Sequence, residues 1–278
     1  MDIQWYPGHM EKAKKSIKNY LKLADGIIEI VDARAPVSTR IKNIEKLASG
    51  KNIIIVLNKA DLADLKITQM WLEYFNSGSI MAIAINALKK SELNKLYGLL
   101  SKPKNKSRIA PLRCVVVGAP NVGKSTFINQ IKGRKTAKTG DFPGITKNIA
   151  WIKASDDLEL LDTPGILQPK YEDRFIAAKL AILGTINPDI LDFEELAKTL
   201  IEYLLKNYPT NIEKRYGVNL DFNSSKVLES IGKARGFLTN GGSVDIERTA
   251  KTVIKEFQEG KLGRISLERP DEMPDKKD

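Results

Sequence analysis

The sequence predicts an α/β fold with a mostly parallel sheet, followed by a small all-α domain. Four short runs are almost continuously apolar and β-branched, as expected of strands that are buried on both faces. Stretches with helical periodicity separate these runs, which is the alternation of βαβ units. Strand-like runs stop before about Ala177, and the rest of the chain has apolar residues at helical spacing.

The strands can be placed from the apolar runs and the polar or turn residues that bound them. We expect them at residues 27–31, 53–57, 80–85, 112–117, 149–154 and 158–161. The connecting helices are expected at residues 41–48, 65–75 and 91–100, with another beginning at Lys124.

The domain boundaries follow from the same reading. Residues 1–177 form the expected sheet domain, and a lysine-rich segment bracketed by prolines at 101–111 connects two parts of it. Residues 178–269 form the helical domain, with helices expected at 192–207, 224–235 and 245–259. Residues 270–278 are charged, contain proline and are expected to be disordered.

The composition favours a cytoplasmic globular protein. The apolar fraction of 42% is ample for a core, and no apolar stretch is long enough to cross a bilayer or act as a secretory signal. Cys114 is the only cysteine and lies in an apolar run, which predicts a core residue and excludes an intrachain disulfide. The formal net charge of +11 favours a polyanionic partner such as nucleic acid.

A phosphate-binding loop runs from Gly118 to Ser125, between a predicted strand and a predicted helix. Its glycines allow backbone N–H groups to surround a phosphate, and the helix N-terminus adds its positive dipole. Lys124 is expected to reach the β- and γ-phosphates, and Ser125 to bind Mg²⁺. The expected nucleotide contacts of this loop are Pro120, Asn121, Val122, Gly123, Lys124, Ser125 and Thr126. The loop pattern alone does not distinguish GTP from ATP.

The segment Asp162-Thr163-Pro164-Gly165 ends the strand expected at 158–161. Its carboxylate is expected to hold a Mg²⁺-bound water, and the Gly165 amide to face the γ-phosphate. Thr146 lies between this segment and the phosphate loop and is the expected threonine that joins Mg²⁺ when the γ-phosphate is present, with Thr139 as the competing choice.

The tetrapeptide Asn58-Lys59-Ala60-Asp61 follows the strand expected at 53–57. The Asp61 carboxylate can accept two hydrogen bonds from guanine, which adenine cannot donate, so we expect GTP to be preferred over ATP by roughly 10⁴. The Asn58 amide is expected to tie the base site to the phosphate loop, and the Lys59 stem to cover the base. Asn86 and Ala87 follow the next strand, and the Ala87 N–H is expected to face guanine O6.

The guanine motif precedes the phosphate loop, the reverse of the order in ordinary GTPases. In this order the chain resembles the circularly permuted P-loop GTPases. It resembles the ribosome biogenesis GTPase A (YlqF) family more narrowly through three segments: Trp5 to Met10 followed by a basic helix, Asp32 to Pro36, and Gly260 to Ile265. The resemblance implies GTP binding and hydrolysis, late assembly of the large (50S) ribosomal subunit, stimulation by that subunit, and 23S rRNA and ribosomal proteins as partners.

The hydrolytic step has two open points. Ile166 occupies the position where ordinary GTPases have a water-orienting glutamine, and an isoleucine cannot orient water. His9, the only histidine, is our candidate to act on the water once the subunit orders the N-terminus, although a surface contact with rRNA is the alternative. Asn121 suggests a K⁺ ion held against the phosphates.

Basic side chains are the candidate phosphate contacts to RNA, although each one singly fits a solvated surface charge equally well. They are Lys12, Lys14, Lys15, Lys18, Arg215, Lys226, Lys233, Arg235, Arg248, Lys251, Lys255 and Arg264. We expect a monomer with no membrane partner. The alternative function is a regulatory GTPase that switches a protein effector without RNA contact, and an ATPase or kinase is disfavoured by Asp61.

Overall fold

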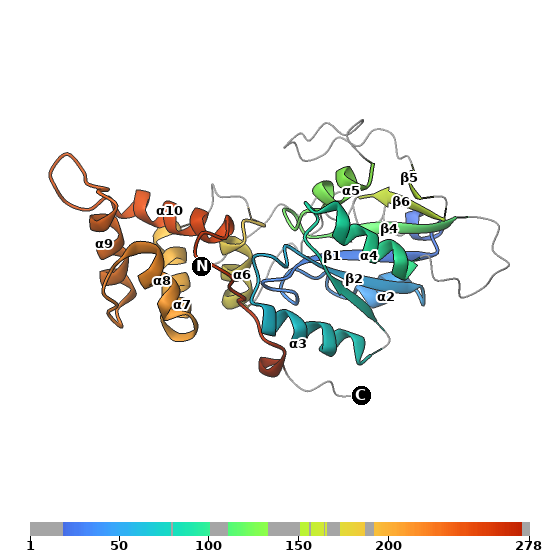
Figure 1. Cartoon of the computed structure of the whole chain (residues 1–278), viewed down its shortest axis with the longest axis horizontal. Coiled ribbons are helices and arrows are strands. Elements are labelled where there is room, and N and C mark those ends of the chain that lie inside the picture. Colours follow the sequence, from blue (N-terminus) through green and yellow to red (C-terminus); the bar gives the residue numbers. More distant parts are fainter. Residues whose placement is uncertain are drawn as a thin grey trace. The chain divides into compact units, whose positions relative to one another are not determined.

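The structure is a computed structural model that describes residues 19–78, 80–100, 111–132, 151–155, 157–163, 165, 173–186 and 192–273. These residues form two compact units (Figure 1). The sheet unit contains the described residues up to Gly165, together with the segment Glu268 to Met273. The helical unit contains the described residues from Asp173 to Leu267.

The sheet has six strands in the order β3-β2-β1-β4-β6-β5. All neighbouring pairs are parallel except β5 and β6, which are antiparallel. The predicted mostly parallel sheet is therefore confirmed. The strands are β1 (Gly26–Asp32), β2 (Asn52–Asn58), β3 (Met81–Ala84), β4 (Leu112–Gly118), β5 (Ile152–Ser155) and β6 (Leu158–Asp162).

The register of the sheet brings the motif-bearing strand ends together. Asp32 at the end of β1 is paired with Asn58 at the end of β2, and Ile30 of β1 is paired with Gly118 at the end of β4. On the other side of β4, Val116 is paired with Asp162, the last residue of β6. Because the carboxyl ends of parallel strands lie at one edge, segments far apart in sequence meet there.

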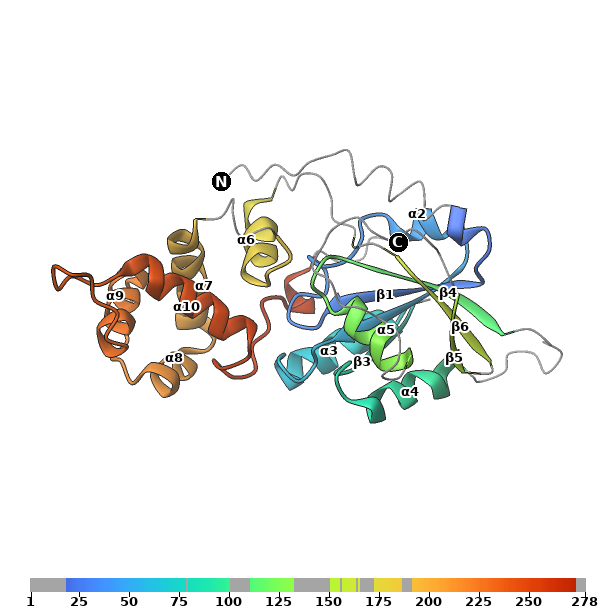
Figure 2. The same ribbon diagram turned by 90° about the horizontal axis from the view of Figure 1, so that it is seen from above.

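Helices cover both faces of the sheet. Helix α4 (Lys90–Leu100) packs beside α5 (Lys124–Lys132), and α2 (Ile44–Ala48) lies on the opposite side of the sheet from these two (Figure 2). Helix α3 (Leu65–Asn76) follows the guanine motif and buries Trp71 and Phe75. The Asp64 carboxylate caps α3 by accepting from the N–H groups of Lys66 and Ile67.

The helical unit is built around α7, which packs against α10, α9, α8 and α6. Leu196, Leu200 and Leu204 of α7 are buried at the spacing expected of an amphipathic helix. Its helices are α6 (Arg174–Ile182), α7 (Phe193–Asn207), α8 (Pro209–Tyr216), α9 (Ser224–Ala234) and α10 (Ile246–Gln258). Apart from these helices, one isolated β-bridge joins Leu238 to Val244.

Two details differ from the sequence expectation. Helices α6 and α8 were not predicted as separate elements, although Asp173 caps α6 and Pro209 opens α8, both typical start signals. Among the described residues, the helical unit begins at Asp173 rather than at residue 178. None of the described helices has the length and apolarity needed to span a bilayer.

The end of the chain is also different from the expectation. Residues 270–273 are not disordered: Pro270–Glu272 form a short 3₁₀ helix, η2, which packs on α3. The preceding Glu268 is 1% exposed and belongs to the sheet unit, so its buried side chain fixes the start of this segment. Residues 274–278 lie outside the described part of the chain.

Candidate nucleotide-binding site

The phosphate loop connects β4 to α5, and its glycines are required by close backbone and side-chain approaches. Gly123 has φ +95°, and a Cβ added there would lie 2.3 Å from Asn58 Nδ2. A Cβ on Gly118 would lie 2.3 Å from the carbonyl oxygen of Ile30. A larger residue at position 123 would therefore push the guanine motif away from the phosphate loop.

Lys124 is the first residue of α5, and its side chain is almost completely buried. Its Nζ donates to the carbonyl oxygen of Ala119 at 2.8 Å. Burial lowers the pKa of Lys124 to about 8, against the opposing effect of the nearby Asp162 carboxylate. Burial likewise raises the pKa of Asp162, against the opposing effects of Lys124 and Lys132.

The end of the Asp162 to Gly165 segment lies directly against the phosphate loop. A Cβ added to Gly165 would lie 3.1 Å from Lys124 Nζ and 3.1 Å from both the nitrogen and Cα of Pro120. Thr163 Oγ1 donates to the carbonyl oxygen of Val116 on β4 at 2.7 Å, which holds the strand end in place. The structure therefore brings Asp162 and Gly165 to the loop, where a side chain at 165 would fit only if its neighbours moved slightly.

Asn58 joins three motifs with one buried amide. Its Nδ2 donates to the carbonyl oxygen of Val122 at 2.8 Å, and its Oδ1 accepts from the N–H of Ala87 at 2.9 Å. The side chain thus links the guanine motif to the phosphate loop and to the residue after β3. The nitrogen and the oxygen of the amide each have a partner within the protein.

The Ala87 N–H, which is expected to face guanine O6, donates to Asn58 Oδ1 in this structure. The contact with guanine stays a prediction. The Asn86 side chain accepts from the N–H of Leu88 at 2.9 Å and so forms a local turn. Asn86 therefore shapes this turn.

Lys59 is held by a backbone carbonyl and a carboxylate. Its Nζ donates to the carbonyl oxygen of Asn121 at 2.7 Å and forms an ion pair with Asp32 at 3.0 Å. Lys59 and Asn121 both have φ near +59°, a conformation that is uncommon for residues other than glycine. Backbone strain of this kind is typical of binding sites and persists only where surrounding contacts hold it.

Asp61 is half-buried at the end of the tetrapeptide, and Ala60 donates its N–H to the carbonyl oxygen of Ile85 at 3.1 Å. Among the described residues no group donates a hydrogen bond to the Asp61 carboxylate. It is therefore available to a ligand, as the guanine hypothesis requires.

The oxygen donors near Lys124 suit a magnesium ion that also binds a nucleotide. Ser125 is exposed in the first turn of α5, and the Asp162 carboxylate lies at the same strand edge. A hydroxyl and a carboxylate are hard oxygen ligands, and Mg²⁺ commonly takes only one or two protein ligands beside phosphates and waters. No cluster of three or more His, Cys, Asp or Glu that could hold a metal occurs in the described part of the chain.

Several expected site residues lie outside the described residues. They are His9, Thr146 and the competing Thr139, Ile166, and the N-terminal lysines Lys12, Lys14, Lys15 and Lys18.

Comparisons with known proteins agree with this arrangement. A sequence model of a family described as a 50S ribosome-binding GTPase matches residues 113–217. The match includes the phosphate loop and the Asp162 motif and leaves out the guanine motif, which lies upstream at residues 58–61.

Full-length relatives decide the family. The chain is 41% identical to ribosome biogenesis GTPase A of Bacillus cereus, covering 98% of this chain and 95% of that protein. It is 36% identical to the protein of the same name from Thermotoga maritima, covering 98% and 96% of the two chains. The chain belongs to the ribosome biogenesis GTPase A family.

Solved structures of this family share the fold. A crystal structure of GNP-bound YlqF from Thermotoga maritima has a TM-score of 0.69 and 32% identity, covering 94% of this chain and 100% of that one. A GDP-bound structure of that protein has a TM-score of 0.71 and 31% identity, covering 92% and 99%. The predicted family, fold class and GTPase character are thereby confirmed.

The basic residues expected to contact RNA fall into two groups in this family member. Most of those described have an acidic neighbour: Lys226 with Asp221, Lys233 with Glu229, Lys251 with Glu247, Lys255 with Glu259, and both Arg215 and Arg235 with Glu256. Arg248 and Arg264 are exposed and have no acidic partner among the described residues. The Arg248 guanidinium lies 4.3 Å from the centre of the Phe237 ring.

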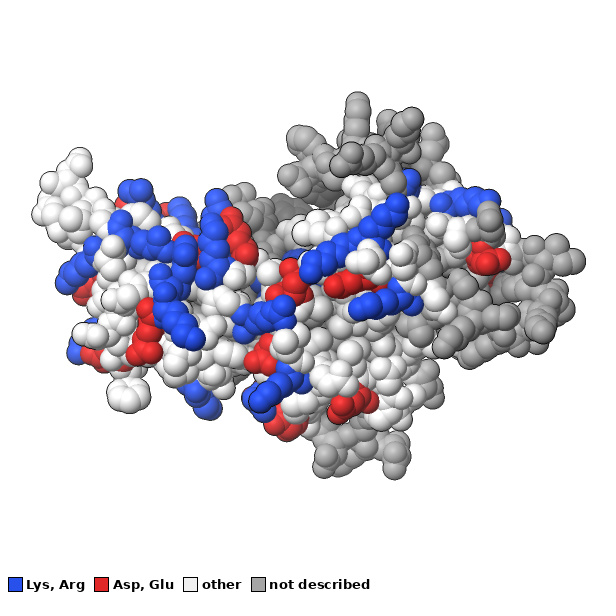
Figure 3. All heavy atoms as spheres, in the orientation of Figure 1, with Lys and Arg blue, Asp and Glu red and all other residues white. Residues whose placement is uncertain are grey.

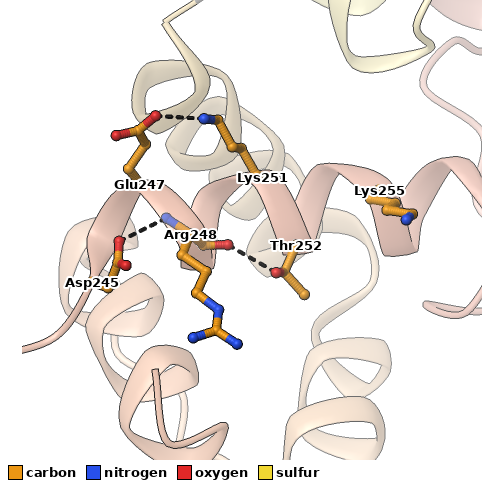
Figure 4. Close-up of a pocket in the computed structure, with 6 residues that line it drawn as sticks. All are labelled: Asp245, Glu247, Arg248, Lys251, Thr252 and Lys255. Atoms are coloured by element: carbon orange, nitrogen blue, oxygen red, sulfur yellow. Dashed lines mark hydrogen bonds and ion pairs between the residues drawn. The ribbon is translucent and has the colours of Figure 1, made fainter. Parts of the chain in front are cut away.

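Lys and Arg side chains outnumber acidic ones on the visible face of the helical unit (Figure 3). A shallow hollow of about 430 Å³ lies along α10 and is lined by residues that include Arg248, Lys251 and Lys255. Figure 4 shows Lys251 turned toward Glu247, while the Arg248 side chain extends away from that pair. None of the nucleotide motifs lines this hollow.

Sequence reasoning missed the buried carboxylates around the guanine motif. Asp32 was noted only as part of a family resemblance, yet it contacts Lys59 directly. Arg34 donates to Asp32 from Nε at 2.9 Å and from NH2 at 2.8 Å, and both side chains are about 1% exposed. These partners keep the pKa of Asp32 well below its usual value, although burial alone would raise it. An Asp-x-Arg pattern directly after an apolar strand was the available signal.

Proposed function

We propose that this chain is a GTP-hydrolysing factor that acts in late assembly of the large ribosomal subunit. One observation carries the proposal: Asn58 and Lys59 bond to the phosphate loop, so motifs in permuted order share one site. The family membership supplies the biological setting, since the relatives are named for ribosome biogenesis.

The chemistry of the site favours guanine over adenine. Asp61 offers a carboxylate to the guanine ring N–H and amino group, and the Lys59 stem lies beside the Asn121 backbone, where it can cover the base. Adenine would leave the carboxylate without a donor, which costs several kcal/mol. The phosphate loop and Lys124 would hold the phosphates.

Ser125, Thr146 and Asp162 would hold Mg²⁺, with Asp162 acting through a water. The ion, when bound, would neutralise charge on the β- and γ-phosphates. Gly165 would direct its N–H toward the γ-phosphate. Because Gly165 has no side chain, the backbone at this position can lie close to Lys124.

Because Ile166 cannot orient the attacking water, another group must activate it. His9 is our candidate for the group that acts on the water when the ribosomal subunit is bound. The substitution His9→Ala should leave GTP affinity intact and abolish subunit-stimulated turnover, whereas unchanged stimulated turnover would refute this role.

Asn121 is our candidate ligand for a K⁺ ion beside the phosphates, since the loop residue is exposed and has φ +59°. Faster hydrolysis in KCl than in NaCl at matched ionic strength is the expected result. Equal rates would exclude a potassium ion.

The RNA contact is proposed to be made by the helical unit and the N-terminal lysines, with 23S rRNA as the target and the cytoplasm as the location. Arg248 and Arg264 are the strongest candidates because no acidic neighbour among the described residues neutralises them. Lysines that already form an ion pair with an acidic side chain should contribute less to RNA binding. Exposed ion pairs are nevertheless weak enough to be exchanged for phosphate contacts. We expect a monomer that binds ribosomal proteins and rRNA together.

Two measurements on the same preparations test the function. GTP turnover is measured with and without purified 50S subunits, and co-sedimentation with 50S precursors is measured with a non-hydrolysable GTP analogue and with GDP. We expect stimulated turnover and co-sedimentation that depends on the analogue. Turnover unaffected by 50S subunits and no co-sedimentation would favour the alternative, a GTPase that switches a protein effector.

A further inference from the structure

Three buried carboxylates converge on one loop, residues 33–41, which follows β1. Glu29 is 0% exposed, while Asp32 and Glu268 are each 1% exposed. Removing a carboxylate from water is costly unless several donors replace the water, so such an arrangement specifies one geometry.

The first contact connects the loop to the nucleotide site. Asp32 binds Arg34 of the loop through two guanidinium nitrogens and also accepts from the Arg34 N–H at 3.1 Å. The same carboxylate forms the ion pair with Lys59 at 3.0 Å. Lys59 in turn donates to the carbonyl oxygen of Asn121 in the phosphate loop. The position of Lys59 therefore depends on Asp32.

The second contact comes from the far end of the chain. The Glu268 carboxylate accepts from the N–H of Val37 at 2.8 Å, from the N–H of Ser38 at 3.2 Å, and from the Ser38 hydroxyl. Its backbone carbonyl accepts from Trp71 Nε1 at 3.2 Å. Trp71 is fully buried in α3, the helix that begins just after Asp61. Glu268 thus binds both the loop and the helix that flank the guanine motif.

Hydrogen bonds inside the loop join these two contacts. Thr39 Oγ1 accepts from the N–H of Asp32 at 3.0 Å and donates to the carbonyl oxygen of Ala35 at 2.7 Å. Thr39 is 0% exposed and is the neighbour of Ser38. A shift of the Val37–Ser38 backbone would therefore disturb Thr39 and, through it, Asp32.

Glu29 secures the other end of the loop. Its carboxylate binds Arg40 at 2.9 Å and accepts from the N–H of Ile41 at 2.7 Å. The loop is consequently held at its start by Asp32, in its middle by Glu268 and at its end by Glu29. Of the three, only Glu268 comes from outside β1, and it follows Leu267, the last residue of the helical unit.

We propose that Glu268 is a positioning residue for guanine-nucleotide binding, which acts through the loop 33–41 on Asp32 and Lys59. Because Glu268 directly follows the last residue of the helical unit, it links that point of the chain to the guanine side of the site. The inference rests on the proposed nucleotide site.

The test compares Glu268→Ala with Glu272→Ala, an exposed residue of the same C-terminal segment whose side chain has no partner among the described residues. We expect Glu268→Ala to weaken GDP and GTP binding about tenfold and to reduce the preference for GTP over ATP. Glu272→Ala removes a side chain that has no recorded contact and keeps the backbone bond to Arg269, so it should leave both unchanged. Nucleotide affinity of Glu268→Ala equal to that of the natural protein would overturn the proposal.

A double-mutant cycle separates positioning from general loss of structure. Effects of Glu268→Ala and Lys59→Ala on GDP affinity should be less than additive, because both changes remove the same Lys59 contact. Additive effects would show that Glu268 acts only on stability and would overturn the proposal. If Glu268→Ala does not fold, Ser38→Ala, which removes one donor to the carboxylate, is compared with Ser77→Ala on the exposed end of α3 in the same cycle.

Failure of this inference is distinguishable from failure of the proposed function. GDP affinity of the isolated protein tests Glu268, whereas stimulation by 50S subunits tests the role in assembly. A protein that binds GDP through Glu268 yet ignores the subunit would keep the inference and refute the proposed partner.

Discussion

The two units of this protein use charge in different ways. In the sheet unit, Glu29, Asp32 and Glu268 are buried and bind backbone N–H groups and arginines of a single loop. In the helical unit, a typical pair is Lys233 with Glu229, whose side chains are 64% and 47% exposed. Buried networks fix one geometry, whereas exposed pairs contribute little stability and can change partners.

This difference fits two kinds of ligand. A nucleotide site must present the same donors and acceptors each time, and any unpaired group in it is costly. A surface that meets a polyanion needs positive charge more than it needs one fixed geometry. Glu256 is the exception in the helical unit, because this buried carboxylate holds Arg215 and Arg235 in fixed positions.

The largest effect is expected from replacing the Asp61 carboxylate, which is proposed to bind guanine. The substitution Asp61→Asn should weaken GTP binding about 10³-fold, because the amide cannot accept both hydrogen bonds from guanine. Binding of xanthosine triphosphate should improve in the same variant, since xanthine has a carbonyl where guanine has an amino group. Fluorescent-nucleotide titration measures both, and Asp64→Asn at the cap of α3 is the matched control. Unchanged GTP affinity would show that Asp61 does not contact the base.

A smaller effect is expected from the exposed arginines of the helical unit. The double substitution Arg248→Ala with Arg264→Ala should weaken 50S binding about tenfold and reduce the slope of log affinity against log salt by about 2. Nucleotide affinity should not change. Co-sedimentation at several salt concentrations measures the slope.

The control for the arginines is Lys233→Ala with Lys226→Ala, two lysines that already have acidic neighbours. This control should change the slope less than the arginine pair does. Equal effects of the two double variants would remove the distinction between paired and unpaired basic residues.

The smallest effect concerns the buried lysine. Burial lowers the pKa of Lys124 to about 8, and phosphates favour its charged form, so nucleotide binding should take up protons near that pH. Because the neutral amine predominates above pH 8, GTP affinity should be about fourfold lower at pH 8.5 than at pH 7. Calorimetry in buffers of different ionisation enthalpy measures the proton uptake. In Lys124→Arg, which stays charged, the pH dependence should disappear; a dependence that persists would assign it to another group.

The sheet, the nucleotide motifs and their permuted order could all be predicted from the amino-acid sequence. The apolar runs predicted β1, β2 and β4 to within a residue or two, because strands buried on both faces are almost continuously apolar. The motifs were recognisable because phosphate and guanine binding need particular residues at fixed local spacing. Such local requirements are visible without a structure.

The contacts between distant segments could not be predicted in this way, because they depend on how the chain packs. Glu268 and Val37 are 231 positions apart, and no local pattern predicts that they meet. The bond from Ala87 to Asn58 likewise depends on how β2 and β3 end side by side. The donors that bind a buried carboxylate are brought to it by the packing of the whole unit. The sequence therefore identifies the charged residue, whereas its hydrogen-bond partners are known only from the fold.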